Sequence, residues 1–150
     1  MFLKALKCGS DVAPKAMMNL GLVYNTRGSF LAQTGDMLGA KKNALDAEKY
    51  IDAAKPLLDH LAASGNADSD MSNYIRQYRP LRLQTHRLLG QLHAGAGDMA
   101  ASEVEFRRAT ENFPDDKGAW QMLGRVLEVQ GKTEEMQSAI EKIKALSPPQ

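Results

Sequence analysis

A fixed step of 34 residues runs through the second half of the chain and limits the folds open to it. Marker residues recur at that spacing: Pro80, Pro114 and Pro148, Gly90 and Gly124, Gly97 and Gly131, Phe106 and Ile140, Ala109 and Ile143. Such a period is typical of solenoids, in which each repeat is one supersecondary unit that cannot bury its apolar face alone. We therefore expect a stack of similar units.

The last unit, residues 118–148, contains two apolar stripes with helical spacing. Trp120, Leu123 and Leu127 lie at positions i, i+3 and i+7, and Met136, Ile140 and Ile143 lie at i, i+4 and i+7. Gly131 stands between the stripes, where a helix end favours a residue that can adopt a positive φ. Two helices that must each bury one stripe are expected to pack as an antiparallel hairpin.

The preceding unit follows the same plan, with His86, Leu89, Gly90, His93, Gly97, Ser102, Phe106, Ala109 and Pro114. This pattern, present in two consecutive units, resembles the tetratricopeptide repeat family. The resemblance implies an all-α fold, a right-handed superhelix of antiparallel helix pairs whose first helices line a concave binding groove. The sequence departs from the family at His86 and His93, which replace Trp and Tyr, and at Ser102, Met136 and Ile143, which replace Ala.

A third unit is expected near the N-terminus. Met17, Leu20, Gly21, Tyr24 and Gly28 match the spacing of Trp120, Leu123, Gly124, Leu127 and Gly131. This alignment predicts a helix over residues 14–27 that begins at Pro14, where proline is well tolerated, and ends before Gly28. Residues 1–9 then form a partial repeat or a capping helix.

Residues 29–70 do not follow the period, and two parsings fit them. One is a degenerate extra repeat closed by Pro80. The other, which we prefer, is one long second helix over residues 40–63, interrupted or bent near Pro56. A loop over 63–70 follows, with Asp70 capping a helix over 71–96 that breaks or kinks at Pro80. Helices over 99–112, capped by Asp98, over 116–129 and over 133–145 complete a single domain with repeats at 14–62, 71–114 and 115–148.

The amino-acid composition argues against several classes of protein. The net charge is +1, so the chain as a whole has no bias toward nucleic acid or anionic membranes. Cys8 is the only cysteine, which excludes an internal disulfide and a zinc site built from several thiols. No apolar run reaches the roughly 18 residues that a membrane-spanning helix needs. We expect a cytoplasmic protein, with organellar import as the alternative because no acidic residue precedes Asp11.

The sequence gives no support to catalysis. It contains no nucleophile elbow, phosphate-binding loop, zinc-protease helix or dinucleotide fingerprint, so we expect neither an enzyme nor a bound cofactor. His86 and His93 share one helix face, but a metal site would need a third ligand. Both histidines also occupy positions where the repeat places a packing aromatic residue, so we expect no metal.

The most distinctive charge feature is an arginine-rich stretch, residues 74–87. Arg76, Arg79, Arg82 and Arg87 are accompanied by no Asp, Glu or Lys between Met71 and Gly97, and Tyr74 and Tyr78 lie among them. Three interpretations fit. The arginines can form a solvated face or pair with acids of a neighbouring helix, bind an acidic peptide or protein, or stack with tyrosine on nucleic-acid bases.

The family resemblance also implies which side chains line the groove. They are Met18 and Leu22, Arg87 and Gln91, and Gln121 and Arg125, with Asn25 and Glu128 one turn further along. Such a groove, apolar at one end and polar at the other, suits an amphipathic helix or an extended segment.

We therefore expect a non-catalytic protein–protein interaction module, an adaptor or scaffold that binds a peptide segment or a subunit of a larger assembly. The alternative is a nucleic-acid-associated helical repeat that uses residues 74–87. Because the ends of a repeat array need a polar cover, we also expect another chain or a second copy, giving a homo-oligomer, to cover at least one end.

Overall fold

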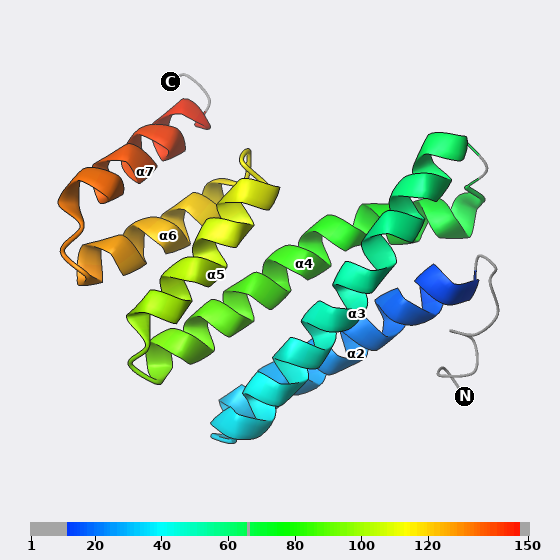
Figure 1. Ribbon diagram of the computed structural model, residues 1–150, viewed down its shortest axis with the longest axis horizontal. Helices are drawn as coiled ribbons and strands as arrows, with labels where there is room; N and C mark the ends of the chain where they lie inside the picture. The colour runs from blue at the N-terminus through cyan, green and yellow to red at the C-terminus, as the bar shows by residue number, and fades with distance from the viewer. Residues whose placement is uncertain (1–11, 66, 148–150) are drawn as a thin grey trace. The chain divides into compact units, whose positions relative to one another are not determined.

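The computed structural model describes residues 12–65 and 67–147, which form six α-helices (Figure 1). These helices are α2 (Val12–Gln33), α3 (Met37–Ser64), α4 (Ser69–Gly95), α5 (Met99–Asn112), α6 (Lys117–Val129) and α7 (Thr133–Ala145). Because these two segments contain no strand, the all-α prediction is confirmed. The helix expected over residues 1–9 lies outside the described residues. The chain divides into two compact units within α4, between Thr85 and His86.

In the first unit, α2 and α3 form a long hairpin, and the N-terminal half of α4 packs on it (Figure 1). The buried side of α3 is rich in alanine: Ala40, Ala44, Ala47, Ile51, Ala54 and Leu58. Gly21 of α2 lies so close to this side that an added Cβ atom would sit 2.5 Å from Ile51 Cγ1. Met18 of α2 and Met71 and Leu81 of α4 complete the core. Small residues thus set the close approach of α2 and α3.

Two helices of this unit are longer than the sequence analysis predicts. α2 continues past Gly28, which is buried inside the helix, and ends at Gln33. α3 runs without interruption from Met37 to Ser64 and contains Pro56. It is the single long helix that we preferred over an extra repeat, although the interruption at Pro56 is absent.

The start of α4 also corrects the prediction. Of the break or kink expected at Pro80, the break is absent, because one helix runs from Ser69 to Gly95. At its N-terminus the capping residue is Asp68, whose Oδ1 accepts a hydrogen bond from the backbone N–H of Met71 at 2.6 Å. The carboxylate of Asp70, which we expected to cap the helix, instead lies 3.6 Å from Lys15 Nζ of α2.

One turn geometry recurs in the hairpins α2–α3, α4–α5 and α6–α7. Gly35, Gly97 and Gly131 take left-handed φ values of 90°, 81° and 70°. The residue after each glycine donates its backbone N–H, at 2.9 Å, to a carbonyl oxygen of the preceding helix: Asp36 to Leu31, Asp98 to His93 and Lys132 to Leu127. Glycine is favoured at this position because a Cβ atom penalises a positive φ.

The shared turn corrects the alignment of the first unit with the other two. Eleven residues before the three glycines lie Tyr24, His86 and Trp120, and seven residues before them lie Gly28, Gly90 and Gly124. Tyr24, not Met17, therefore corresponds to Trp120. The sequence alignment is wrong by seven residues because it places Gly28 at the turn instead of inside the helix.

In the second unit, the C-terminal half of α4 is followed by α5, α6 and α7. Its core contains Phe106, Leu123, Val126 and Leu127, covered by Trp120, Met122 and Met136. Asp98 and Asp116 cap α5 and α6 by accepting from the backbone N–H groups of Ala101 at 3.0 Å and Ala119 at 2.8 Å. The three helix ranges predicted for this part of the chain agree with the structure to within one residue.

Gly90 and Gly124 occupy equivalent repeat positions but different surroundings. A Cβ atom added to Gly90 would lie 2.5 Å from Cζ of Phe106, whose ring is buried. A Cβ atom added to Gly124 would lie 3.9 Å from Ala139 Cβ, an ordinary contact.

We predict that Gly90→Ala lowers the free energy of unfolding by about 1–3 kcal/mol, because a packed ring must move. Gly124→Ala should be neutral or stabilising by up to about 1 kcal/mol, since alanine favours a helix over glycine. Urea unfolding followed by circular dichroism compares the two. Equal effects of both substitutions would contradict the close packing of α4 on Phe106.

Candidate partner-binding surface

The structure buries three of the eleven residues predicted to bind a partner. Met18 is 2 % exposed and belongs to the core of the first unit. Asn25 is 0 % exposed, and its amide atoms have no hydrogen-bond partner in the described part of the chain. Arg82 is 2 % exposed. The seven-residue error in the alignment of the first unit accounts for Met18. With Tyr24 in the place of His86 and Trp120, Asn25 takes the place of Arg87 and Gln121, so its burial is a difference between the first hairpin and the other two.

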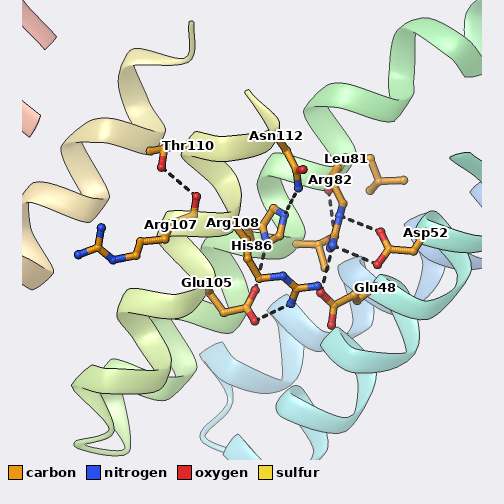
Figure 2. A network of polar contacts seen from close by, with 11 residues as sticks. Glu48, Asp52, Leu81, Arg82, His86, Glu105, Arg107, Arg108, Thr110 and Asn112 are labelled. Atoms are coloured by element: carbon orange, nitrogen blue, oxygen red, sulfur yellow. Dashed lines mark hydrogen bonds and ion pairs between the residues drawn. The ribbon is translucent and has the colours of Figure 1, made fainter. Parts of the chain in front are cut away.

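Arg82 joins α4 to α3 through a buried ion pair (Figure 2). Its Nη2 lies 3.1 Å from Glu48 Oε1 and 3.1 Å from Asp52 Oδ2, and its Nε lies 3.0 Å from Asp52 Oδ1. For this arginine, the interpretation as a partner of acids on a neighbouring helix is correct. A planar guanidinium suits the role because it can contact two carboxylates at once.

The two tyrosines of the arginine-rich stretch also make contacts within the first unit. Tyr74 and Tyr78 pack against the core of the first unit, and the Tyr74 hydroxyl is hydrogen-bonded to Asn19 of α2 at 3.1 Å. Burial raises the pKa of Tyr78, although the charge of Arg82 acts in the opposite direction. Both rings are therefore partly buried, and each has a contact within the first unit.

The remaining predicted residues reach the surface. In the first unit, Leu22 is 46 % exposed, Arg76 is exposed and Arg79 is half-buried. In the second unit all five are exposed: Arg87 and Gln91 on α4, and Gln121, Arg125 and Glu128 on α6. We refer to these five as the Arg–Gln face.

The Arg–Gln face follows the repeat. Arg87 and Gln91 are one helical turn apart, and the next hairpin places Gln121 and Arg125 at the same two positions. Side chains four residues apart lie on one side of a helix. Within residues 12–65 and 67–147, neither Arg87 nor Arg125 makes an ion pair. Two unpaired guanidinium groups and two primary amides are therefore presented at matching places of successive hairpins.

His86, at the aromatic position of the period, makes a buried polar contact (Figure 2). Its Nδ1 lies 3.0 Å from Glu105 Oε2, and its Nε2 lies 3.5 Å from the side-chain amide of Asn112. Burial acts to raise the pKa of Glu105, but the hydrogen bond from His86 and the charge of Arg108 outweigh it, so the pKa is lowered. His86 thus fastens α5 to α4. His93 has a different neighbour: its Nδ1 lies 3.9 Å from Asp98 Oδ2.

Glu103 of α5 is the centre of a second polar cluster, which the sequence analysis missed. Its carboxylate accepts hydrogen bonds from Arg107 Nε at 2.7 Å, Gln130 Nε2 at 2.8 Å and Lys132 Nζ at 2.7 Å. Burial acts to raise the pKa of Glu103, but these three hydrogen bonds dominate and lower it to about 2. Gln130 also donates to the Met99 carbonyl at 3.2 Å. The cluster ties α5 to the turn between α6 and α7, and so positions α6.

Comparison with known proteins adds no identification. No protein-family model and no curated protein matches this chain. Among the described residues, none of the helices is long and apolar enough to cross a membrane. Evidence for function therefore comes from the surfaces themselves.

We predict that Arg82→Ala lowers the free energy of unfolding by about 1–3 kcal/mol, because it removes a buried guanidinium that contacts Glu48 and Asp52, whose side chains are 16 % and 45 % exposed and so remain partly solvated. The matched variant Arg76→Ala removes an exposed arginine of the same stretch and should change stability by no more than about 0.5 kcal/mol. Urea titration of both variants measures the difference. Similar stabilities would refute the structural role of Arg82.

We also predict an acid-dependent contribution from Glu103. Its folded pKa of about 2 lies below the ordinary value of 4.5, so its stabilisation is present at neutral pH and is lost as the pH falls from about 5 to about 2. Glu103→Gln should lower stability at pH 7, and its difference from wild type should disappear near pH 2. Unfolding free energies measured across this range test it. The exposed control Glu141→Gln should differ little from wild type at any pH.

Proposed function

We propose that this chain is a non-catalytic protein-interaction module of the tetratricopeptide repeat type, whose Arg–Gln face binds an extended acidic segment of a partner protein. Two successive hairpins that present arginine and glutamine at the same exposed positions are the observation on which this proposal rests. An adaptor or scaffold needs a rigid surface with repeated contacts, and a pair of equivalent hairpins supplies one.

The side-chain types define the class of partner. A guanidinium group can donate two parallel hydrogen bonds to one carboxylate, so Arg87 and Arg125 suit aspartate or glutamate side chains. The amides of Gln91 and Gln121 both donate and accept, which suits the backbone N–H and C=O groups of an extended chain. Glu128, the acid on this face, would disfavour a carboxylate at the C-terminal end of α6. An extended segment with spaced acidic residues meets all three conditions.

Burial within the arginine-rich stretch supports this choice over nucleic acid. Arg82 is held by two carboxylates, and Tyr74 and Tyr78 pack on the core of the first unit. The exposed arginines of the second unit stand beside glutamines instead of aromatic side chains. Binding of single-stranded nucleic acid normally combines a basic groove with stacking residues.

We predict that Arg87→Glu combined with Arg125→Glu weakens binding to an acidic peptide by about tenfold or more, because two charge-assisted contacts become repulsive. The probe is a fluorescein-labelled, extended peptide rich in aspartate and glutamate, followed by fluorescence anisotropy. The matched control, Lys142→Glu with Lys144→Glu on α7, changes the net charge equally and should retain binding.

A length-matched basic peptide and a single-stranded oligonucleotide complete the experiment. Preference for the acidic peptide, lost only in the variant that combines Arg87→Glu and Arg125→Glu, would support the proposal. Equal binding by wild type and that variant would refute the Arg–Gln face as the site. Stronger binding of the oligonucleotide, with a steep dependence on salt concentration, would favour nucleic acid instead.

A further inference from the structure

The turn between α2 and α3 carries large apolar side chains in water. Phe30 is 62 % exposed, Met37 is 56 % exposed and Leu38 is 82 % exposed. We refer to these three residues as the hairpin tip. Single exposed apolar residues are common on protein surfaces. Here three lie within nine residues of sequence around one short turn, and none of them belongs to the core of the first unit.

The side chains of Phe30 and Leu38 point to different sides of the tip. Phe30 follows Asn25, which is buried, by five residues, so it lies about 140° around α2 from that buried position. Leu38 precedes the buried Ala40 by two residues and lies about 160° around α3 from it. Because α2 and α3 face each other, their outer surfaces point in opposite directions. A flat protein surface could contact one of them, whereas a fluid apolar layer that surrounds the tip could contact all.

Basic side chains stand one turn behind the tip. Arg27 of α2 and Lys41 and Lys42 of α3 are exposed, and none of the three makes an ion pair in the described part of the chain. Asp36 is the only acid between positions 27 and 42. Its carboxylate accepts a hydrogen bond from the backbone N–H of Gly39 at 2.8 Å and caps α3. The tip therefore carries apolar side chains on both helices, on either side of the polar turn over residues 33–36, and positive charge one helical turn further back.

Several polar groups of the turn are paired within the hairpin. The N–H of Asp36 donates to the Leu31 carbonyl at 2.9 Å, and the N–H of Met37 donates to the Gly35 carbonyl at 3.0 Å. The Thr34 hydroxyl donates to the Phe30 carbonyl at 3.2 Å. Unpaired backbone groups are the main obstacle to placing a turn near lipid, and this turn pairs the backbone N–H groups of residues 34–37 internally.

We propose that the hairpin tip inserts into the surface of an anionic lipid bilayer. Phe30, Met37 and Leu38 enter the boundary between headgroups and acyl chains, and Arg27, Lys41 and Lys42 bind the lipid phosphates. Aromatic and aliphatic side chains combined with nearby lysine or arginine are the features that give reversible interfacial binding. The hairpin tip belongs to the first unit, so this inference is independent of the Arg–Gln face of the second unit.

Flotation of the full chain with vesicles tests the proposal. Vesicles of phosphatidylcholine mixed with phosphatidylglycerol should bind the protein, vesicles of phosphatidylcholine alone should bind it much more weakly, and added salt should reduce the binding. Phe30→Ser combined with Leu38→Ser should weaken binding by about tenfold or more. Lys41→Glu combined with Lys42→Glu should weaken it to a similar degree.

The control removes two exposed apolar side chains elsewhere. Val104 and Val129 are exposed in the second unit, and their replacement by serine should leave vesicle binding unchanged. Circular dichroism and urea unfolding should show that the tip variants fold like wild type, because the replaced side chains are exposed.

Two results would overturn the proposal. One is the absence of binding to anionic vesicles at low salt, or binding that the tip variants do not reduce. The other is a dimer, detected by light scattering, that forms through the tip and is lost in the Phe30→Ser and Leu38→Ser variant, since a second copy would then be the occupant.

Discussion

The close approach of paired helices is the constraint on which the rest of this structure depends. Gly21 brings α2 against Ile51 of α3, and Gly90 brings α4 against Phe106 of α5. At these points there is no room for a side chain on the glycine, so the distance between the helices is set by backbone and by one large apolar group. Once that distance is fixed, the left-handed glycine of each turn determines how the second helix returns. The exposed residues of α4 and α6 take matching positions for the same reason.

The 34-residue period predicts the helices correctly where the local sequence signals agree with one another. In the second unit, aspartate caps, turn glycines and apolar stripes all indicate the same helices, and the predicted ranges hold. In the first unit Gly28 was the misleading residue, because glycine can end a helix or lie inside one where a neighbour packs closely. The identical tripeptides Gly35–Asp36–Met37 and Gly97–Asp98–Met99 contain the information that identifies the turn. Pro56 and Pro80 likewise do not end their helices, since buried contacts on both sides hold the chain helical.

The residues predicted to bind a partner show the same difference between the two units. Arg87, Gln91, Gln121, Arg125 and Glu128 are exposed as predicted, because their alignment follows the correct register. Met18 inherits the wrong register and is buried, whereas Asn25 is buried although the corrected register gives it the place of Arg87 and Gln121. The partners of Arg82 and Glu103 could not be predicted from spacing. Glu48 lies 34 residues before Arg82 in sequence, and Lys132 lies 29 residues after Glu103. Helical periodicity places a residue on a face, but it does not say which charge of another helix will meet it.

Burial separates the charged residues of this chain into two roles. Arg82 and Glu103 are removed from water, so their interactions are less screened by salt than those of exposed pairs. They hold helices in place. Arg87, Arg125, Lys41 and Lys42 remain solvated and unpaired in the described segments, so their fields reach a partner but fall off within about 10 Å at moderate ionic strength. Contacts made by such groups form and break readily. A surface of this kind suits reversible association, whereas permanent assembly would require apolar area that neither the Arg–Gln face nor the hairpin tip provides.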